Sequence, residues 1–230
     1  MIRSPLYAAC AAGLVLALAC AAAGAQEPVS SFTDRLEIDN GMTLISDGLY
    51  AQTIGTTQSY VAVGPAGHQA LLKKVRELRG TPTKGVAGGA SGPLDELVST
   101  LSAPVPLNQD LYGDCAGSHP GATGPFEVRA LAGGGIGNGP YGASGLVANS
   151  SSPTITTKNR VYVTVYDADG IVVGQQETIT YGNTQAVASA YAPQGRGCTA
   201  DSLATVTCPG ATRPAITAIA HNQRSGCIIH

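Results

Sequence analysis

Apolar and polar residues alternate along much of the chain, and a period of two residues predicts β-strands. The clearest case is RVYVTVY at 160–166, where Val161, Val163 and Val165 fall on one face of a strand. Similar short runs, separated by turn-forming residues, occur at 125–131, 144–149, 171–181, 184–192, 203–208 and 215–221. This spacing predicts an antiparallel, immunoglobulin-like β-sandwich over residues 110–230.

Strand and helix patterns are combined nearer the N-terminus. The dipeptides Asn40-Gly41 and Asp47-Gly48 mark turns, and strands are expected at 49–54 and 59–63, ended by Gly64-Pro65. The period then becomes helical and predicts helices at 68–80 and 93–101. Their apolar stripes are Leu71, Leu72, Val75 and Leu78 in the first helix and Leu94, Leu97, Val98 and Leu101 in the second.

A boundary is predicted where Pro104 and Pro106 flank Val105 and hold the chain extended. We therefore expect an α+β protein with a small α/β region, a β-meander plus helices, at 26–103, a linker at 104–109 and the β-sandwich at 110–230. The division rests on the loss of helical periodicity beyond the two prolines.

The first 25 residues read as a secretory signal peptide. Arg3 precedes an alanine-rich apolar stretch, and Ala23-Gly24-Ala25 forms a small-x-small cleavage site before Gln26. An alternative is lipoprotein processing at Cys20, and another is an uncleaved membrane anchor. No later run is long and apolar enough to predict a transmembrane segment. A secreted or periplasmic location is expected.

The charge balance argues against one class of partner. Charged residues make up 12% of the chain and the formal net charge is -2, which leaves no basic surface for nucleic acid. Nucleic acid is therefore not expected as a partner, and the expected export predicts an unidentified partner in the cell envelope or the extracellular space.

Export determines how the cysteines are interpreted, because disulfides persist in oxidising compartments. After signal cleavage Cys115, Cys198, Cys208 and Cys227 remain, and four cysteines allow three pairings. We predict bonds between Cys198 and Cys208 and between Cys115 and Cys227. The alternative is a zinc site, since Cys115 with His119 and Cys227 with His230 supply two thiolates and two imidazoles.

Two glycine- or aspartate-containing segments resemble ligand-binding motifs, but their sequences are more typical of turns between strands. In GGGIGNGPYG at 133–142, Gly137, Gly139 and Gly142 have dinucleotide-binding spacing, but Pro153 and the serines that follow do not predict the required helix. We therefore predict a loop between strands and no cofactor. In the same way Asp167 and Asp169 lack the alternating ligands of a calcium loop, and DADG predicts a hairpin turn.

Catalytic motifs are missing from the pattern. The chain has no G-x-S-x-G, and the spacing of His68, His119, His221 and His230 singles out no catalytic triad. The sequence therefore favours an exported, non-catalytic binding or interaction protein whose ligand and partner it does not identify.

Residues 36–107 carry a resemblance to a known family. The segments ISDGLYAQTIGTTQSYVAVGPAGH, QALLKKVRELRGTPTKGV and GGASGPLDELVSTLSAPVPLN resemble the opening of a metallo-β-lactamase-fold hydrolase. The family's H-x-H-x-D-H metal motif is expected between Val86 and Gly88, where this chain has Ala87. His68 and Asp95 do not stand at ligand positions either. The resemblance implies, as the alternative function, a diverged hydrolase that has lost its standard metal site.

Overall fold

The structure is a computed structural model that describes residues 41–79, 92–104, 126–134, 141–149, 156–182, 184–193, 196–224 and 227. The strands are β1 (Thr43–Ser46), β2 (Leu49–Ile54), β3 (Thr57–Val63), β4 (Phe126–Gly134), β5 (Tyr141–Asn149), β6 (Lys158–Tyr166), β7 (Val172–Tyr181), β8 (Ala186–Ala192), β9 (Thr199–Thr207) and β10 (Ile216–Gln223). The helices are α3 (Gly64–Leu78) and α4 (Pro93–Ser102). The predicted α+β class and the predicted strand and helix segments within these ranges are confirmed.

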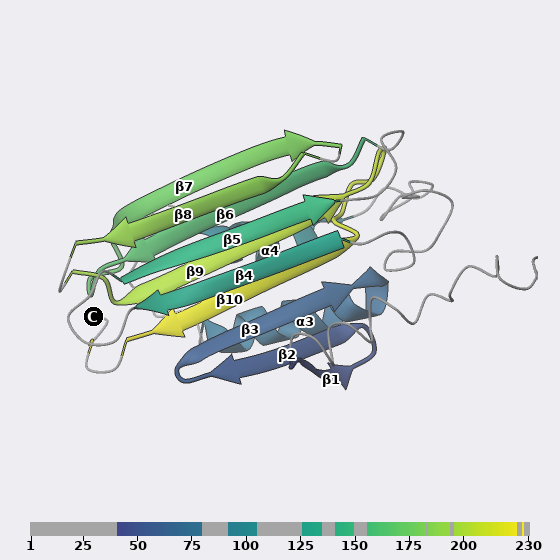
Figure 1. The fold of residues 1–230 in the computed structure, drawn as a ribbon. Coiled ribbons are helices and arrows are strands. Elements are labelled where there is room, and N and C mark those ends of the chain that lie inside the picture. The colour runs from purple at the N-terminus through teal and green to yellow at the C-terminus, as the bar shows by residue number, and fades with distance from the viewer. Residues whose placement is uncertain are drawn as a thin grey trace, which may run out of the picture.

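The molecule has three layers. A seven-stranded sheet has the order β1-β2-β3-β10-β9-β6-β7, and a three-stranded sheet has the order β4-β5-β8. All of the strand pairs recorded in both sheets are antiparallel. In Figure 1, β4, β5 and β8 lie over β10, β9 and β6, while α3 and α4 lie on the other face of the large sheet. This packing is sandwich-like, and its immunoglobulin-like character remains a prediction.

The two regions predicted on either side of 104–109 share one sheet. Strand β3 from the first region pairs with β10 from the second over seven residue pairs, from Val63 opposite Ile216 to Thr57 opposite Asn222. Because a sheet joined by a full ladder of hydrogen bonds cannot be divided without breaking it, the two regions are not separate structural units. The meander β1–β3 forms one side of the large sheet.

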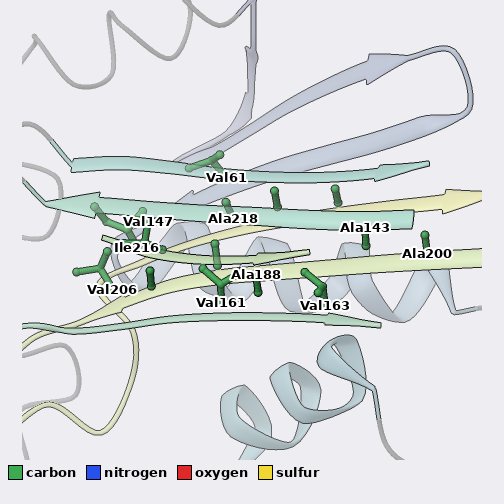
Figure 2. Close-up of a cluster of buried hydrophobic side chains, with 14 of the residues drawn as sticks. Val61, Ala143, Val147, Val161, Val163, Ala188, Ala200, Val206, Ile216 and Ala218 are labelled. Atoms are coloured by element: carbon green, nitrogen blue, oxygen red, sulfur yellow. The ribbon is translucent and has the colours of Figure 1, made fainter. Parts of the chain in front are cut away.

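Small apolar side chains fill the space between the two sheets. Val161, Val163 and Val165 of β6 are completely buried there, as their alternation predicts. Figure 2 labels Val161 and Val163 of this set and shows them among other inward-pointing residues, which it labels as Val61, Ala143, Val147, Ala188, Ala200, Val206, Ile216 and Ala218. Alanine is frequent on the facing strands, and its short side chain lets the sheets approach closely.

The helices bury their leucine stripes on the opposite face of the large sheet. Side chains of α3 and α4 form a second apolar cluster with Leu203 of β9 and Ile219 of β10. Helix α3 begins at Gly64, four residues before the predicted start, with Pro65 in its first turn. Gly64 has φ of +66°, so it turns the chain out of β3, and the fixed φ of proline suits the first helical turn. Within the described ranges neither helix is long and apolar enough to cross a lipid bilayer.

The two loops singled out in the sequence lie between strands. Gly134 pairs with Tyr141, so β4 and β5 flank residues 135–140, and Gly142 lies within β5 rather than at the start of a helix. The aspartate turn joins β6 to β7, and Asp167 Oδ1 accepts hydrogen bonds from the backbone N–H groups of Asp169 and Ile171. The hairpin-turn prediction is therefore confirmed.

The predicted cysteine pairing is wrong. Cys198 is bonded to Cys227, with 5.7 Å between their Cα atoms. Cys198 precedes β9 and Cys227 follows β10, and these antiparallel neighbours bring the two residues to the same end of the sheet. Cys208 lies beyond the other end of β9, roughly 30 Å of extended chain away at about 3.3 Å per residue, which is too far for a bond to Cys198. Cys208 is itself in a disulfide.

The same bond removes a ligand from the alternative zinc set, because a disulfide sulfur is not a thiolate. Cys115, His119 and His230 lie outside the described residues, as do the predicted signal peptide and Cys20. The described part of the chain contains no group of three His, Cys, Asp or Glu side chains that could hold a metal ion.

Candidate binding site

A row of polar residues crosses the helix-covered face of the seven-stranded sheet. Tyr60, Leu203 and Ile219 point toward the helices, and side chains two positions away along a strand share that face. The residues in register across six strands of this row are Thr53, Gln58, His221, Asp201, Thr164 and Gln175. Along β3, β9 and β10 the row lies two residues away from Tyr60, Leu203 and Ile219, which pack against the helices.

His221 and Asp201 form the central pair of this polar row. The His221 Nδ1 lies 2.7 Å from Asp201 Oδ1, and the two side chains are 14% and 10% exposed. In the neutral imidazole, the nitrogen that faces a carboxylate carries the proton, so Nδ1–H donates to Asp201. In this form the carboxylate orients the ring and Nε2 is a hydrogen-bond acceptor.

A cavity of about 500 Å³ lies beside this pair. Its walls come from the start of β3, the last turns of α3 and the end of β10. The lining residues are Thr56, Gln58, Tyr60, Lys74, Glu77, Leu78, His221 and Gln223. Known small-molecule sites span about 300–1,000 Å³, so this cavity has the size of a ligand site.

Hydrogen bonds within the lining hold its side chains in place. The Tyr60 hydroxyl donates to Gln58 Oε1 over 3.1 Å, and Lys74 Nζ donates to Glu77 Oε2 over 2.7 Å. Burial raises the pKa of Tyr60, so its phenol is neutral at physiological pH. Behind the cavity, Asn222 Nδ2 donates to Thr56 Oγ1 and Thr57 Oγ1, each over 2.8 Å. These contacts join the ends of β3 and β10.

Polar groups continue on the other side of Asp201. Gln175 Nε2 donates to the Tyr162 hydroxyl over 2.8 Å. Burial raises the pKa of Tyr166, and the charge of Asp201 acts in the same direction. The start of α4 lies directly against that phenol, because a Cβ added to Gly92 would overlap Tyr166 Oη. A larger residue at this position would therefore require the Tyr166 side chain to move.

An ion-pair network fixes α4 to the large sheet nearby. Arg160 of β6 contacts Glu96 of α4 through two hydrogen bonds and donates to Glu177 Oε1 of β7 over 2.5 Å. The guanidinium lowers the pKa of Glu96, so the carboxylate stays charged. This network positions the helix that borders the polar row.

The remaining described histidine, His68, has a structural position. It is fully buried in α3, with Nδ1 2.7 Å from the Gly64 carbonyl oxygen and Nε2 2.8 Å from Thr217 Oγ1. A carbonyl oxygen accepts, so Nδ1 carries the proton and Nε2 accepts from the threonine. Burial lowers the pKa of His68 to about 4. The ring is neutral and connects α3 to β10.

Sequence reasoning missed the pair at the centre of the site. His221 stood among four unassigned histidines, and Asp201, 20 residues away in sequence, was not considered beside it. The connection requires knowing that β9 and β10 are neighbours and that residue 201 lies opposite residue 221. The positions were detectable only as polar interruptions on strands that are otherwise apolar.

Comparison with known proteins adds no relative: no protein-family model, curated protein or solved structure matches this chain.

Proposed function

We propose that this chain is an exported, non-catalytic binding protein whose ligand occupies the cavity between α3 and the ends of β3 and β10. The observation that carries the proposal is the cavity itself, of about 500 Å³, with polar side chains from three elements directed at one space. The antiparallel scaffold and the bond between Cys198 and Cys227 fit a protein of an oxidising compartment.

Export is part of the proposal and rests on the signal-like residues 1–25. We expect the mature protein to begin at Gln26, or at a lipid-modified Cys20 in the alternative. Intact-mass analysis of protein recovered from the periplasm or medium of an expressing bacterium measures this start. Retention of the first 25 residues on a cytoplasmic product would contradict export.

Ligand binding is tested by native mass spectrometry of the protein purified without denaturation. We expect a small molecule to be retained at one per chain by the wild type and lost from Gln58→Ala, whose side chain lines the cavity. Val187→Thr is the matched control, because Val187 is exposed on β8 of the other sheet. Equal retention by both variants would place the ligand elsewhere and contradict the cavity as the site.

A hydrolase diverged from the metallo-β-lactamase fold is the second candidate. The pairing of His221 with Asp201 favours it, since a carboxylate-oriented imidazole is the usual form of a general base. Zinc analysis after dialysis separates the two functions. Stoichiometric zinc, together with ester or amide hydrolysis that His221→Gln abolishes, would replace the binding proposal with the enzyme.

A further inference from the structure

The charges that line the cavity neutralise each other. Lys74 and Glu77 are its charged pair, they stand one helical turn apart on α3, and the ammonium donates to the carboxylate over 2.7 Å. A ligand with a net charge would therefore find no unpaired opposite charge in the lining, whereas a neutral ligand needs none.

The strands present a hydrogen-bond donor and an acceptor side by side. Asp201 holds Nδ1 of His221, which leaves Nε2 to accept from a ligand O–H or N–H. Gln58 Oε1 accepts from Tyr60, which leaves the amide NH₂ to donate. Gln58 and His221 are opposite each other on β3 and β10, where facing Cβ atoms are about 4.5–5.5 Å apart. Neighbouring hydroxyl groups on a sugar ring, each able to donate and accept, match such a pair.

An apolar wall completes the lining. The Tyr60 ring and the half-buried Leu78 lie beside the polar groups. A pyranose ring has the same division, with hydroxyl groups around its edge and C–H groups on its faces, and aromatic side chains contact such faces while their polar tips bond to hydroxyls. The cavity volume suits one or two sugar rings.

From these three features, the geometry points to a neutral mono- or disaccharide as the ligand of the cavity. This inference rests on the proposed binding function and names its substrate class. His221 Nε2 accepts from one ring hydroxyl, the Gln58 amide donates to its neighbour, and Tyr60 with Leu78 covers the C–H face.

Isothermal titration and saturation-transfer NMR with the purified mature protein test this inference. The neutral probes are glucose, N-acetylglucosamine, maltose and cellobiose; glucose 6-phosphate is the charged probe and glycine betaine the zwitterionic one. We expect at least one neutral saccharide to bind, and Gln58→Ala to raise its Kd about tenfold. Thr53→Ala is the control, because Thr53 is exposed in the same polar row next to Gln58 and does not line the cavity.

Two further variants separate ligand contact from folding and from charge. His221→Gln, which retains a donor for Asp201, should also weaken saccharide binding about tenfold while the circular dichroism spectrum is unchanged. The double variant Lys74→Gln, Glu77→Gln should change the saccharide Kd less than about threefold, since a neutral ligand needs neither charge.

The outcomes distinguish this inference from the binding function. Gln58-dependent binding of glucose 6-phosphate or betaine without any neutral saccharide overturns the carbohydrate class and keeps the cavity as a ligand site. Absence of binding by all six probes also overturns it, and the molecule retained in the native mass spectrum then decides whether the binding function stands.

Discussion

The two faces of the seven-stranded sheet are built in different ways. One face packs Val161, Val163 and Val165 of β6 against the alanine-rich three-stranded sheet, and most of this contact is apolar. Buried Ser202 bonds across it to the Ser144 carbonyl oxygen. The other face packs leucines of α3 and α4 near its middle, and then becomes a polar row with His221 and Asp201 at its centre. The first face makes one core between two sheets, whereas the second changes from an apolar core to a polar row beside a cavity within two residues along each strand.

The difference follows from what covers each face. A sheet laid on a sheet covers its partner strand by strand, so a polar side chain there needs a partner within the protein, as Ser202 has at the Ser144 carbonyl oxygen. A helix covers a narrower stripe, and a cavity remains between the last turns of α3 and the strand ends that carry Gln58 and His221. Polar side chains of the sheet can point into that cavity. Four predictions test this contrast.

The largest effect is expected from a charge in the sandwich core. Val163→Asp places a carboxylate where the wild-type side chain has no exposure, and it should cost at least about 4 kcal/mol of unfolding free energy, a large part of the total for a domain. Tyr162→Phe is the control on the opposite face, where loss of the bond from Gln175 should cost about 1 kcal/mol. Chemical denaturation measures both losses of unfolding free energy. Similar losses for the two variants would contradict the difference between the two faces.

The next effect concerns the disulfide at the polar end of the sheet. Cys227→Ala opens the link to Cys198, which spans 29 residues, and should lower the unfolding free energy by about 3–4 kcal/mol and Tm by about 10 °C. In calorimetry, reductant should lower the wild-type Tm by at least as much, because it also opens the disulfide of Cys208, and a chelator should not change the Tm. Peptide mapping that joins Cys198 to Cys208 would contradict the pairing.

A slightly smaller effect is expected from acid on the helix-covered face. The pKa of His68 falls from 6.5 when unfolded to about 4 when folded, so the unfolded chain binds the proton first as pH decreases. The stabilising contribution is complete above pH 6.5 and is lost between pH 6.5 and 4, by about 1.4 kcal/mol per pH unit and about 3 kcal/mol in total. Urea titrations across this range should show that slope in the wild type and a smaller one in His68→Gln.

The smallest effect has the opposite sign. Thr199 Oγ1 is buried beside the polar row, and among the described residues it has no hydrogen-bond partner. Thr199→Val keeps the shape and removes the unpaired hydroxyl, so the unfolding free energy should rise by about 1 kcal/mol. If the unfolding free energy instead fell by about 1 kcal/mol, an ordered water would bond this hydroxyl in the wild type and the row would be hydrated.

Local structure was largely predictable from the sequence. The alternation in RVYVTVY gives strand β6, the leucine repeat gives α3 and α4, and the aspartate turn gives the β6–β7 hairpin. These elements depend on residues close together in the chain, and period and turn chemistry report on such residues directly. The start of α3 was missed because Gly64 and Pro65, assigned to the end of a strand, also begin the helix.

The amino-acid sequence by itself determined which segments are strands and which are helices, because side-chain period and turn residues act locally. The tertiary structure alone decided that β3 lies beside β10, that Cys198 meets Cys227, and that His221 faces Asp201 next to a cavity. Each of these depends on strand order and register across the sheet. Register is set by how all the buried faces pack together, so it cannot be obtained from any one segment.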